Sequence, residues 1–418
     1  MVASVHIVGA GLAGLAAATR LSVAGITVTV HEAANQAGGR CRSYHDSALD
    51  MMIDNGNHLV LSGNSSVLAY VEEIGAQDHL IGPQHATFPF VDLATNERWT
   101  LRPNDGLVPW WIFDRRRRVP GTRVIDYFAL ARLLWSGPQK TICEVLDCNG
   151  TLFNRLIRPL LLAALNTEPR EGSAALAAAV IREIFSVGGR ACRPLIARNG
   201  LASAFIDPAL QLLNKRNAKV HFGHRLRALS VDDGRVTALQ FGDKPLALQS
   251  EDAVILAVPP MVAVALVPNG LQVPTEFRAI VNAHFRITAG RDLAPITGVV
   301  NGMVEWLFAF PDRLSVTISA ADRLLETPRE TLAEQIWREV RTIARIDAAL
   351  PPWQIVRERR ATFAALPSQN AKRPPAETRY KNLVLAGDWT ATGLPATIES
   401  AIRSGHRAAS LVGKMAAH

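Results

Sequence analysis

The feature that most constrains the fold of this chain is a glycine-rich stretch near its N-terminus, VHIVGAGLAGLAAATRLSVAGITVTVHE. An apolar, strand-like run at 5–8 leads into the pattern Gly-x-Gly-x-x-Gly at 9–14 and then into a helix of small residues expected over 15–24. A second strand is expected over 26–30, and Glu32 follows it. Strand, turn, helix, strand and acid in this order make a complete dinucleotide-binding βαβ unit, so the sequence predicts a Rossmann-like α/β domain.

Each glycine of the motif meets a different steric need. Gly9 permits the tight turn, Gly11 lets a pyrophosphate reach the backbone, and Gly14 lets the helix lie close to the sheet. The turn residues Leu12 and Ala13 lead into the N-terminus of the helix, which supplies N–H donors and the positive end of the helix dipole. These residues are therefore expected to bind the pyrophosphate of a dinucleotide.

Two further patterns select the dinucleotide. Glu32, followed by Ala33, is placed to accept both hydroxyls of a ribose and to repel a 2′-phosphate. Gly38, Gly39 and Arg40 come directly after the unit and resemble the second half of the extended FAD fingerprint of the amine-oxidase and phytoene-desaturase superfamily. That resemblance implies that these three residues meet the flavin side of the pyrophosphate of FAD.

The C-terminal part of the chain carries a matching pattern. NLVLAGDWT reads as a strand that ends near Gly387 and Asp388, and a helix is expected from about residue 396, after a proline suited to its first turn. The resemblance implies that Asp388 binds the ribityl chain and that amides near Thr397 and Ile398 face the flavin C2 carbonyl. Ser400 stands where the superfamily usually has glycine.

Because cofactor motifs lie at both ends, the FAD-binding domain is expected to be discontinuous, comprising 1–84, 190–260 and 376–418. Its middle part is expected to hold a hairpin turning at Asp233-Gly234 and a buried strand in EDAVILAVPP. The resemblance implies that the backbone of Leu226 touches the adenine. The remaining segments, 85–189 and 261–375, are expected to form an inserted mixed α+β substrate domain.

The loop that contains Gly56, Asn57 and His58 is the candidate catalytic region. The matching loop in related enzymes passes beside the isoalloxazine ring, which implies that these three residues contact the cofactor. His58 is either a proton-transfer residue or a structural hydrogen-bonding residue, and both interpretations stay open. Amine oxidases of the superfamily normally carry a lysine near flavin N5, whereas the corresponding segment here, IVNAHFRITAG, has Arg286 and no lysine. Amine oxidation is therefore disfavoured.

Five further segments resemble one branch of the superfamily, the squalene-associated desaturase-like family with the hydroxysqualene dehydroxylases of bacterial hopanoid synthesis. They are DNGNHLVLSGN, RPLLLAALNTEP, PLIARNGLASAFIDPAL, IVNAHFR and ERRATFAALP. The resemblance implies reductive removal of an allylic hydroxyl from a hydrophobic C30 isoprenoid, giving squalene. The alternatives are a phytoene-type desaturase or amine oxidase that runs the flavin oxidatively, and a nonenzymatic FAD-binding protein. One dinucleotide fingerprint is present, so the electron donor is expected to be external and is not identified.

A substrate of this kind resides in lipid, and segment 105–136 offers a membrane contact. Trp110, Trp111 and Phe113 precede the arginines at 115–118, and apolar residues from Val124 to Trp135 fall on one helical stripe. The alternative is a buried amphipathic helix beside a solvated charge run. No signal peptide or membrane span is evident, so we expect a cytoplasmic protein bound peripherally to the anionic inner face of the membrane.

Charge, cysteine and histidine patterns exclude several other classes. The net charge of +8 comes with scattered arginines and no recognition motif, so nucleic-acid binding is not expected. The four cysteines have no framework or zinc spacing and are expected to be buried or incidental thiols. His221 and His224 lie three apart in a strand-like segment, which predicts opposite faces and ordinary packing rather than metal binding.

Overall fold

The N-terminal βαβ unit forms the centre of a five-stranded parallel sheet in the computed structural model, which describes residues 4–185, 188–268, 270–288, 290 and 293–415. The strand order is β10-β2-β1-β14-β20. The strands are β10 (Lys219–His221), β2 (Thr27–His31), β1 (Ser4–Val8), β14 (Ala253–Leu256) and β20 (Leu383–Leu385). Strands from three distant parts of the chain thus share one sheet, while the exact domain boundaries stay a prediction.

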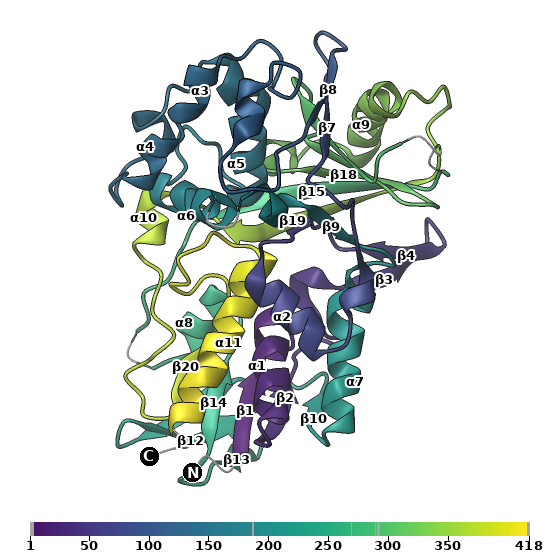
Figure 1. Cartoon of the computed structure of the whole chain (residues 1–418). Helices are drawn as coiled ribbons and strands as arrows, with labels where there is room; N and C mark the ends of the chain where they lie inside the picture. Colours follow the sequence, from purple (N-terminus) through teal and green to yellow (C-terminus); the bar gives the residue numbers. More distant parts are fainter. Residues whose placement is uncertain (1–3, 186–187, 269, 289, 291–292, 416–418) are drawn as a thin grey trace.

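One face of this sheet is covered by helices, as Figure 1 shows. They are α1 (Leu12–Val23), α2 (Ser65–Glu73), α7 (Asp207–Lys215) and α11 (Ile398–Met415). The small residues of α1 allow α11 to approach closely, because a Cβ on Gly405 would lie 2.2 Å from the carbonyl oxygen of Ala13. The helix begins at Leu12 rather than Leu15, since the turn itself supplies its first residues.

The other face carries a three-stranded antiparallel sheet of β11 (Ala228–Asp232), β12 (Arg235–Gln240) and β13 (Pro245–Ala247). Apolar side chains of this small sheet pack on Val8, Val254 and Leu256 of the large one. The hairpin predicted at Asp233-Gly234 is confirmed, because Asp232 pairs with Arg235 across it. The buried strand predicted in EDAVILAVPP is confirmed as β14, whose residues are all buried.

A seven-stranded sheet forms the second half of the molecule, in the order β19-β15-β18-β17-β16-β7-β8. Only β16 and β7 run parallel among its neighbouring pairs. The strands are β7 (Phe88–Asp92), β8 (Arg98–Leu101), β15 (Phe277–Phe285), β16 (Ile296–Val300), β17 (Trp306–Ala309), β18 (Leu314–Ile318) and β19 (Trp353–Phe363). Helix α9 (Arg329–Ala344) packs on one face of this sheet.

The opposite face meets a layer of helices and the loops that join the two halves (Figure 1). The helices are α3 (Val124–Phe128), α4 (Ala131–Leu134), α5 (Arg158–Leu165) and α6 (Ala174–Phe185). The side chains of β17 alternate between the two faces, because Trp306 and Phe308 join the core on this face while Leu307 joins the core under α9. Shorter pieces are α8 (Pro260–Leu266), α10 (Pro367–Asn370), the β3–β4 hairpin (Ser43–Asp46 and Met51–Asp54), and β5 (Val60–Leu61) and β6 (Leu80–Ile81), which pair with β9 (Pro194–Ala197).

The expectation that all cysteines are thiols was wrong for one pair. Cys143 and Cys148 form a disulfide with their Cα atoms 5.5 Å apart. A short 3-10 turn at Ile142–Glu144 folds this segment back on itself, which the spacing of five residues does not by itself reveal. Cys41 and Cys192 are buried free thiols, as expected.

Candidate functional site

The two glycine-rich segments of the sequence lie against each other at the carboxyl end of β1. Gly11 and Gly38 form an isolated β-bridge, and the amide of Gly38 donates to the carbonyl of Ala10 at 2.8 Å. A Cβ on Gly14 would lie 1.9 Å from the carbonyl oxygen of Gly9, so Gly14 is required for packing. A Cβ on Gly11 would meet nothing within 4 Å, so this glycine leaves its backbone open to a ligand.

The first turn of α1 follows the paired glycine segments directly, and no side chain caps it. Gly11 is the N-cap residue and has no side chain that could accept from the amides of the first turn, and that turn contains no acidic residue. Leu12 and Ala13 are themselves buried. Uncapped amides and a positive dipole end fit the phosphates of a dinucleotide.

Glu32 lies beside the glycine turn, at the end of β2. Its Oε2 accepts from the amide of Ala10 at 2.7 Å, and its Oε1 accepts from the amide of Ala34 at 2.8 Å. Both bonds fix the carboxylate, and each oxygen keeps a second lone pair for a hydroxyl donor. Ala33 is exposed at the same corner, whereas the side chain of Leu226 is buried in the core and leaves only its backbone for an adenine.

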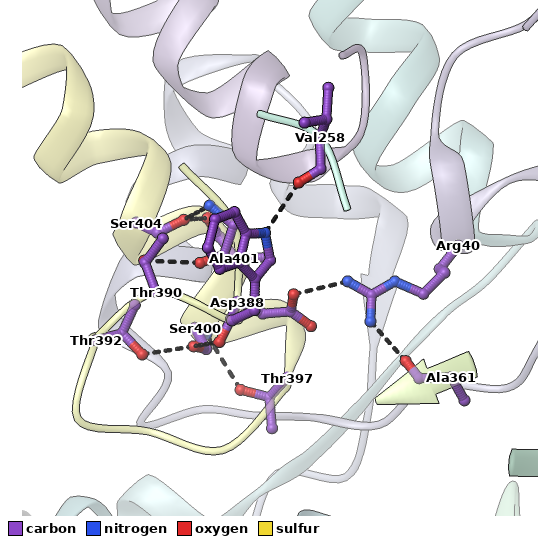
Figure 2. A network of polar contacts seen from close by, with 12 residues as sticks. Arg40, Val258, Ala361, Asp388, Thr390, Thr392, Thr397, Ser400, Ala401 and Ser404 are labelled. Carbon is purple, nitrogen blue, oxygen red and sulfur yellow. Dashed lines mark hydrogen bonds and ion pairs between the residues drawn. The ribbon is translucent and has the colours of Figure 1, made fainter. Parts of the chain in front are cut away.

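Arg40 joins the N-terminal fingerprint to the C-terminal one (Figure 2). Its Nη2 donates to Oδ1 of Asp388 at 2.7 Å, and its Nη1 donates to the carbonyl of Ala361 on β19. Asp388 is buried, and its negative charge raises the pKa of the Arg40 guanidinium. The structure thus brings together two residues that the sequence assigned to the same cofactor, at the junction of the two large sheets.

The loop after Asp388 is held by hydrogen bonds that the sequence did not predict. The hydroxyls of Thr392 and Ser400 lie 2.7 Å apart, and Ser400 also donates to the carbonyl of Asp388 (Figure 2). Buried Arg373 donates to the same carbonyl at 3.0 Å and to Oγ1 of Thr392 at 2.9 Å. The serine that replaces the usual glycine therefore fastens the loop to α11.

Thr397 caps α11, because its hydroxyl oxygen accepts from the amide of Ser400 at 3.1 Å. This cap leaves the backbone around Thr397 and Ile398 at the start of the helix, beside Gly387 and Asp388. Gly387 is fixed there by its amide, which donates to the hydroxyl of Ser404 at 2.8 Å. The predicted C-terminal residues are thus assembled at one helix N-terminus.

The loop with Gly56, Asn57 and His58 lies against the seven-stranded sheet. Nδ2 of Asn57 donates to Oγ1 of Thr317 and to the carbonyl of Val316, both at 3.2 Å. Thr317 in turn donates to Oδ1 of Asn282 at 2.8 Å. Sequence reasoning missed Asn282 and Thr317; the signal was a pair of polar residues, Asn282 and His284, on one face of the mostly apolar strand β15.

His58 is half-buried beside this network. Burial and the nearby Arg40 guanidinium lower the pKa of His58 to about 4. The imidazole is therefore neutral at pH 7 and can donate only its single N–H proton. Gly56 is packed against Asn282, whose Nδ2 would lie 3.1 Å from an added Cβ.

Four histidines form a second cluster, at the edge of the five-stranded sheet. Nδ1 of His31 lies 2.9 Å from Nδ1 of His224, and its Nε2 lies 3.2 Å from Nδ1 of His6. His221 stacks on His31, so the prediction that His221 and His224 face apart was wrong. The chain turns sharply at Gly223 after β10 ends, which brings both rings to one recess of about 480 Å³.

The predicted membrane segment is more irregular than expected. It holds two short helices, α3 and α4, so the proposed single helical stripe was wrong: Tyr127 is buried, whereas Trp135 is 80% exposed. Trp111 packs edge-on against Tyr127, and Arg117 binds the carbonyl of Arg102. Exposed apolar side chains nevertheless concentrate here: Leu107, Val108, Trp110, Phe113, Ile125, Phe128 and Trp135. Within the described residues, no helix is long and apolar enough to cross a membrane.

Comparisons with known proteins agree with this geometry. The model of the family of flavin containing amine oxidoreductases matches residues 12–413. Hydroxysqualene dehydroxylases of Sinorhizobium fredii and Rhodopseudomonas palustris are each 57% identical to this chain, over 98% of this chain and 98% of theirs. A probable zeta-carotene desaturase of Synechococcus elongatus is only 21% identical, over 97% of each chain.

Solved structures support the fold. An oxidoreductase from Methanosarcina mazei has a TM-score of 0.73 at 15% identity, covering 97% of this chain and 99% of that one. Cyclohexylamine oxidase from Brevibacterium oxydans has a TM-score of 0.71 at 16% identity and covers 100% of both chains. The chain therefore belongs to the flavin containing amine oxidoreductase family, and within it to the hydroxysqualene dehydroxylases.

Proposed function

We propose that this protein binds FAD and removes the allylic hydroxyl of hydroxysqualene reductively to give squalene. The observation that carries this proposal is 57% identity, over nearly the whole chain, to two proteins named for that activity. The absence of a lysine from the segment 280–290 agrees with a reaction other than amine oxidation. Protonation of the hydroxyl and loss of water would leave an allylic cation, which needs one hydride to become the product.

Reduced FAD, when bound, would supply that hydride. The residues that fit the pyrophosphate of the cofactor are Gly11, whose backbone is open, the adjoining glycines Gly38 and Gly39, and the uncapped amides of Leu12 and Ala13. Glu32 would hold the adenosine ribose, and Asp388 the ribityl chain. Both positive-φ glycines, Gly38 at 106° and Gly39 at 54°, hold the backbone in a conformation that other residues rarely adopt.

The chain's own contribution to the chemistry is to orient the substrate, exclude water and deliver a proton. His58 is placed in the loop beside the polar network, but its lowered pKa means that its resting form at neutral pH is the neutral imidazole. It would first take a proton from solvent, and the imidazolium so formed would donate that proton to the substrate hydroxyl and return to the neutral ring. The apolar residues of α5 and the aromatic residues Trp306, Phe308 and Phe310 would surround the hydrocarbon chain.

The test is an anaerobic reaction of purified, chemically reduced holoenzyme with hydroxysqualene, followed by chromatography of the products. Squalene in an amount equal to the flavin is expected. No squalene from enzyme that is fully loaded with reduced flavin would contradict the proposal. Formation of an additional double bond by oxidised enzyme would favour the desaturase alternative.

We also propose that segment 105–136 rests on an anionic membrane surface, from which a C30 substrate can enter. Trp110 is 66% exposed, and Phe113 packs beside it. Arg115 and Arg116 are exposed next to these rings. Aromatic side chains at the lipid boundary combined with arginines on anionic headgroups would give reversible peripheral binding.

A further inference from the structure

One residue of the central strand β18 stays partly accessible, although the rest of that strand is buried. β18 lies between β15 and β17, and Thr317 is its only residue that is not buried. The side chain of Asn57 reaches this position from the other half of the molecule and bonds Oγ1 of Thr317. The accessible point is therefore at the junction between the candidate cofactor loop and the seven-stranded sheet.

At this point the side chain of Asn57 has one acceptor atom, Oδ1, that receives no hydrogen bond from the described residues. Its Nδ2 donates to Val316 and Thr317, which orients the amide, because a carbonyl such as that of Val316 can only accept. Oδ1 of Asn57 consequently points away from these bonds. It is buried and has no donor among the residues that the structure describes. Such an acceptor is costly unless a ligand supplies the missing donor.

Trp306 contributes an unpaired donor to the same face of the sheet. It lies directly opposite Thr317 in the register of β17 and β18, and only 5% of its surface is exposed. Its ring is held edge-on against Phe90, with centroids 5.7 Å apart. The buried Nε1 of Trp306 has no acceptor among the described residues.

We propose that Asn57 Oδ1 and Trp306 Nε1 form the subsite that recognises the substrate hydroxyl. A hydroxyl is both a donor and an acceptor, so its proton would satisfy Asn57 and one lone pair would accept from Trp306. The second lone pair stays available for the proton that starts the loss of water. This assignment rests on the proposed function, and it gives Asn57 a role toward the substrate in addition to the cofactor contact expected of its loop.

The test compares two ligands that differ in the hydroxyl, hydroxysqualene and squalene, on oxidised holoenzyme without reductant, so that neither is turned over. Dissociation constants are read from the perturbation of the flavin spectrum. Asn57→Leu and Trp306→Phe should each reduce the preference for hydroxysqualene about five- to tenfold, the effect of one hydrogen bond, and leave squalene affinity unchanged. Trp99→Phe is the matched control. The ring of Trp99 also packs on Phe90, and its buried Nε1 also has no acceptor among the described residues. This variant should keep the wild-type preference for hydroxysqualene over squalene.

Two results would overturn the assignment. Equal weakening of both ligands would make Asn57 and Trp306 ordinary packing residues. Weaker FAD binding with an unchanged ligand preference would assign the unpaired acceptor to the flavin. Failure of the proposed function is separate, because it would appear as wild-type reduced enzyme that forms no squalene, whereas this test measures affinity alone.

Discussion

Arg40 donates a hydrogen bond of 2.7 Å from Nη2 to Oδ1 of Asp388, a residue 348 positions further along the chain. The ion pair connects two sequence patterns that are expected at neighbouring parts of one cofactor, the flavin side of the pyrophosphate and the ribityl chain. Ala361 of β19 accepts a second bond from the same guanidinium. One side chain therefore joins the candidate cofactor residue Asp388 to the seven-stranded sheet.

Removal of either partner of this pair should weaken FAD binding. Arg40→Met and Asp388→Asn are each expected to raise the dissociation constant of FAD about tenfold or more, because a hydrogen bond to a charged group contributes about 1.5–3 kcal/mol. The double variant should lose less than the sum, since each single change already breaks the pair. Titration of apoprotein with FAD measures this, and unchanged affinity in both single variants would refute the cofactor map.

Glu32 should determine which ribose the site accepts. Glu32→Gln removes the charge and keeps one carbonyl oxygen, so FAD affinity should fall about fivefold to tenfold. ADP-ribose competes for this part of the site, and its 2′-phosphorylated form should compete poorly with the wild-type protein and better with the variant. If both competitors behave identically with both proteins, Glu32 only fixes the glycine turn through Ala10 and Ala34.

The residues whose positions could be predicted from the sequence are those whose type is required by the local backbone geometry or packing. Gly9 has a positive φ, and a Cβ on Gly14 would clash with the carbonyl oxygen of Gly9, so the structure gives both glycines a steric reason that the motif predicts. The polar network around Thr317 could not be placed, because it joins three segments by tertiary contact. Local spacing was equally unable to reveal the turn that brings His224 onto His31.

That histidine cluster should make stability depend on pH. Burial, followed by the charges of His6, His224 and His221, lowers the pKa of His31 to about 3. The unfolded chain, with a histidine pKa of about 6.5, binds more protons than the folded chain between these values. The free energy of unfolding should therefore fall as pH falls from about 6.5 toward 3, and be flat above about 7.

Replacement of the buried ring tests this dependence. His31→Asn should lower stability at pH 7.5 but reduce the proton uptake on unfolding by up to about one between pH 4 and 6. Urea unfolding of wild type and variant across this range measures the slope. An identical pH slope in both proteins would show that His31 does not titrate between the two states.

Exposed aromatic residues of segment 105–136 should bind anionic lipid. Changing Trp110, Phe113, Phe128 and Trp135 to serine should abolish cosedimentation with phosphatidylglycerol vesicles and leave FAD content intact. High salt should weaken wild-type binding, because each arginine at the surface contributes about 1 kcal/mol through screened charge. Phe222→Ser removes an exposed aromatic ring elsewhere, 43% exposed, and serves as the control that should bind normally. Undiminished binding of the fourfold variant would place the lipid contact elsewhere.

The direction of electron flow separates a dehydroxylase from the oxidative enzymes of the same fold. Under anaerobic conditions, enzyme loaded with reduced FAD should convert hydroxysqualene to squalene in one turnover and end with oxidised flavin. Deuterium placed at flavin N5 should appear at the carbon that lost its hydroxyl, provided that exchange with solvent is slower than the reaction. A desaturase would instead start with oxidised flavin and reduce it.

His58 can be tested in the same single turnover. If His58 passes on the proton, His58→Gln should slow squalene formation about a hundredfold, the lower range for general acid catalysis, without changing FAD affinity. The lowered pKa of His58, about 4, also predicts the direction in which the rate changes with pH. Lowering the pH from 7 toward 4 should speed the wild-type reaction, because the protonated fraction of His58 rises, and should affect the variant less. Equal rates and equal pH profiles in the two proteins would leave His58 a structural neighbour of Arg40, and the proton would then have to reach the hydroxyl from another group or from water.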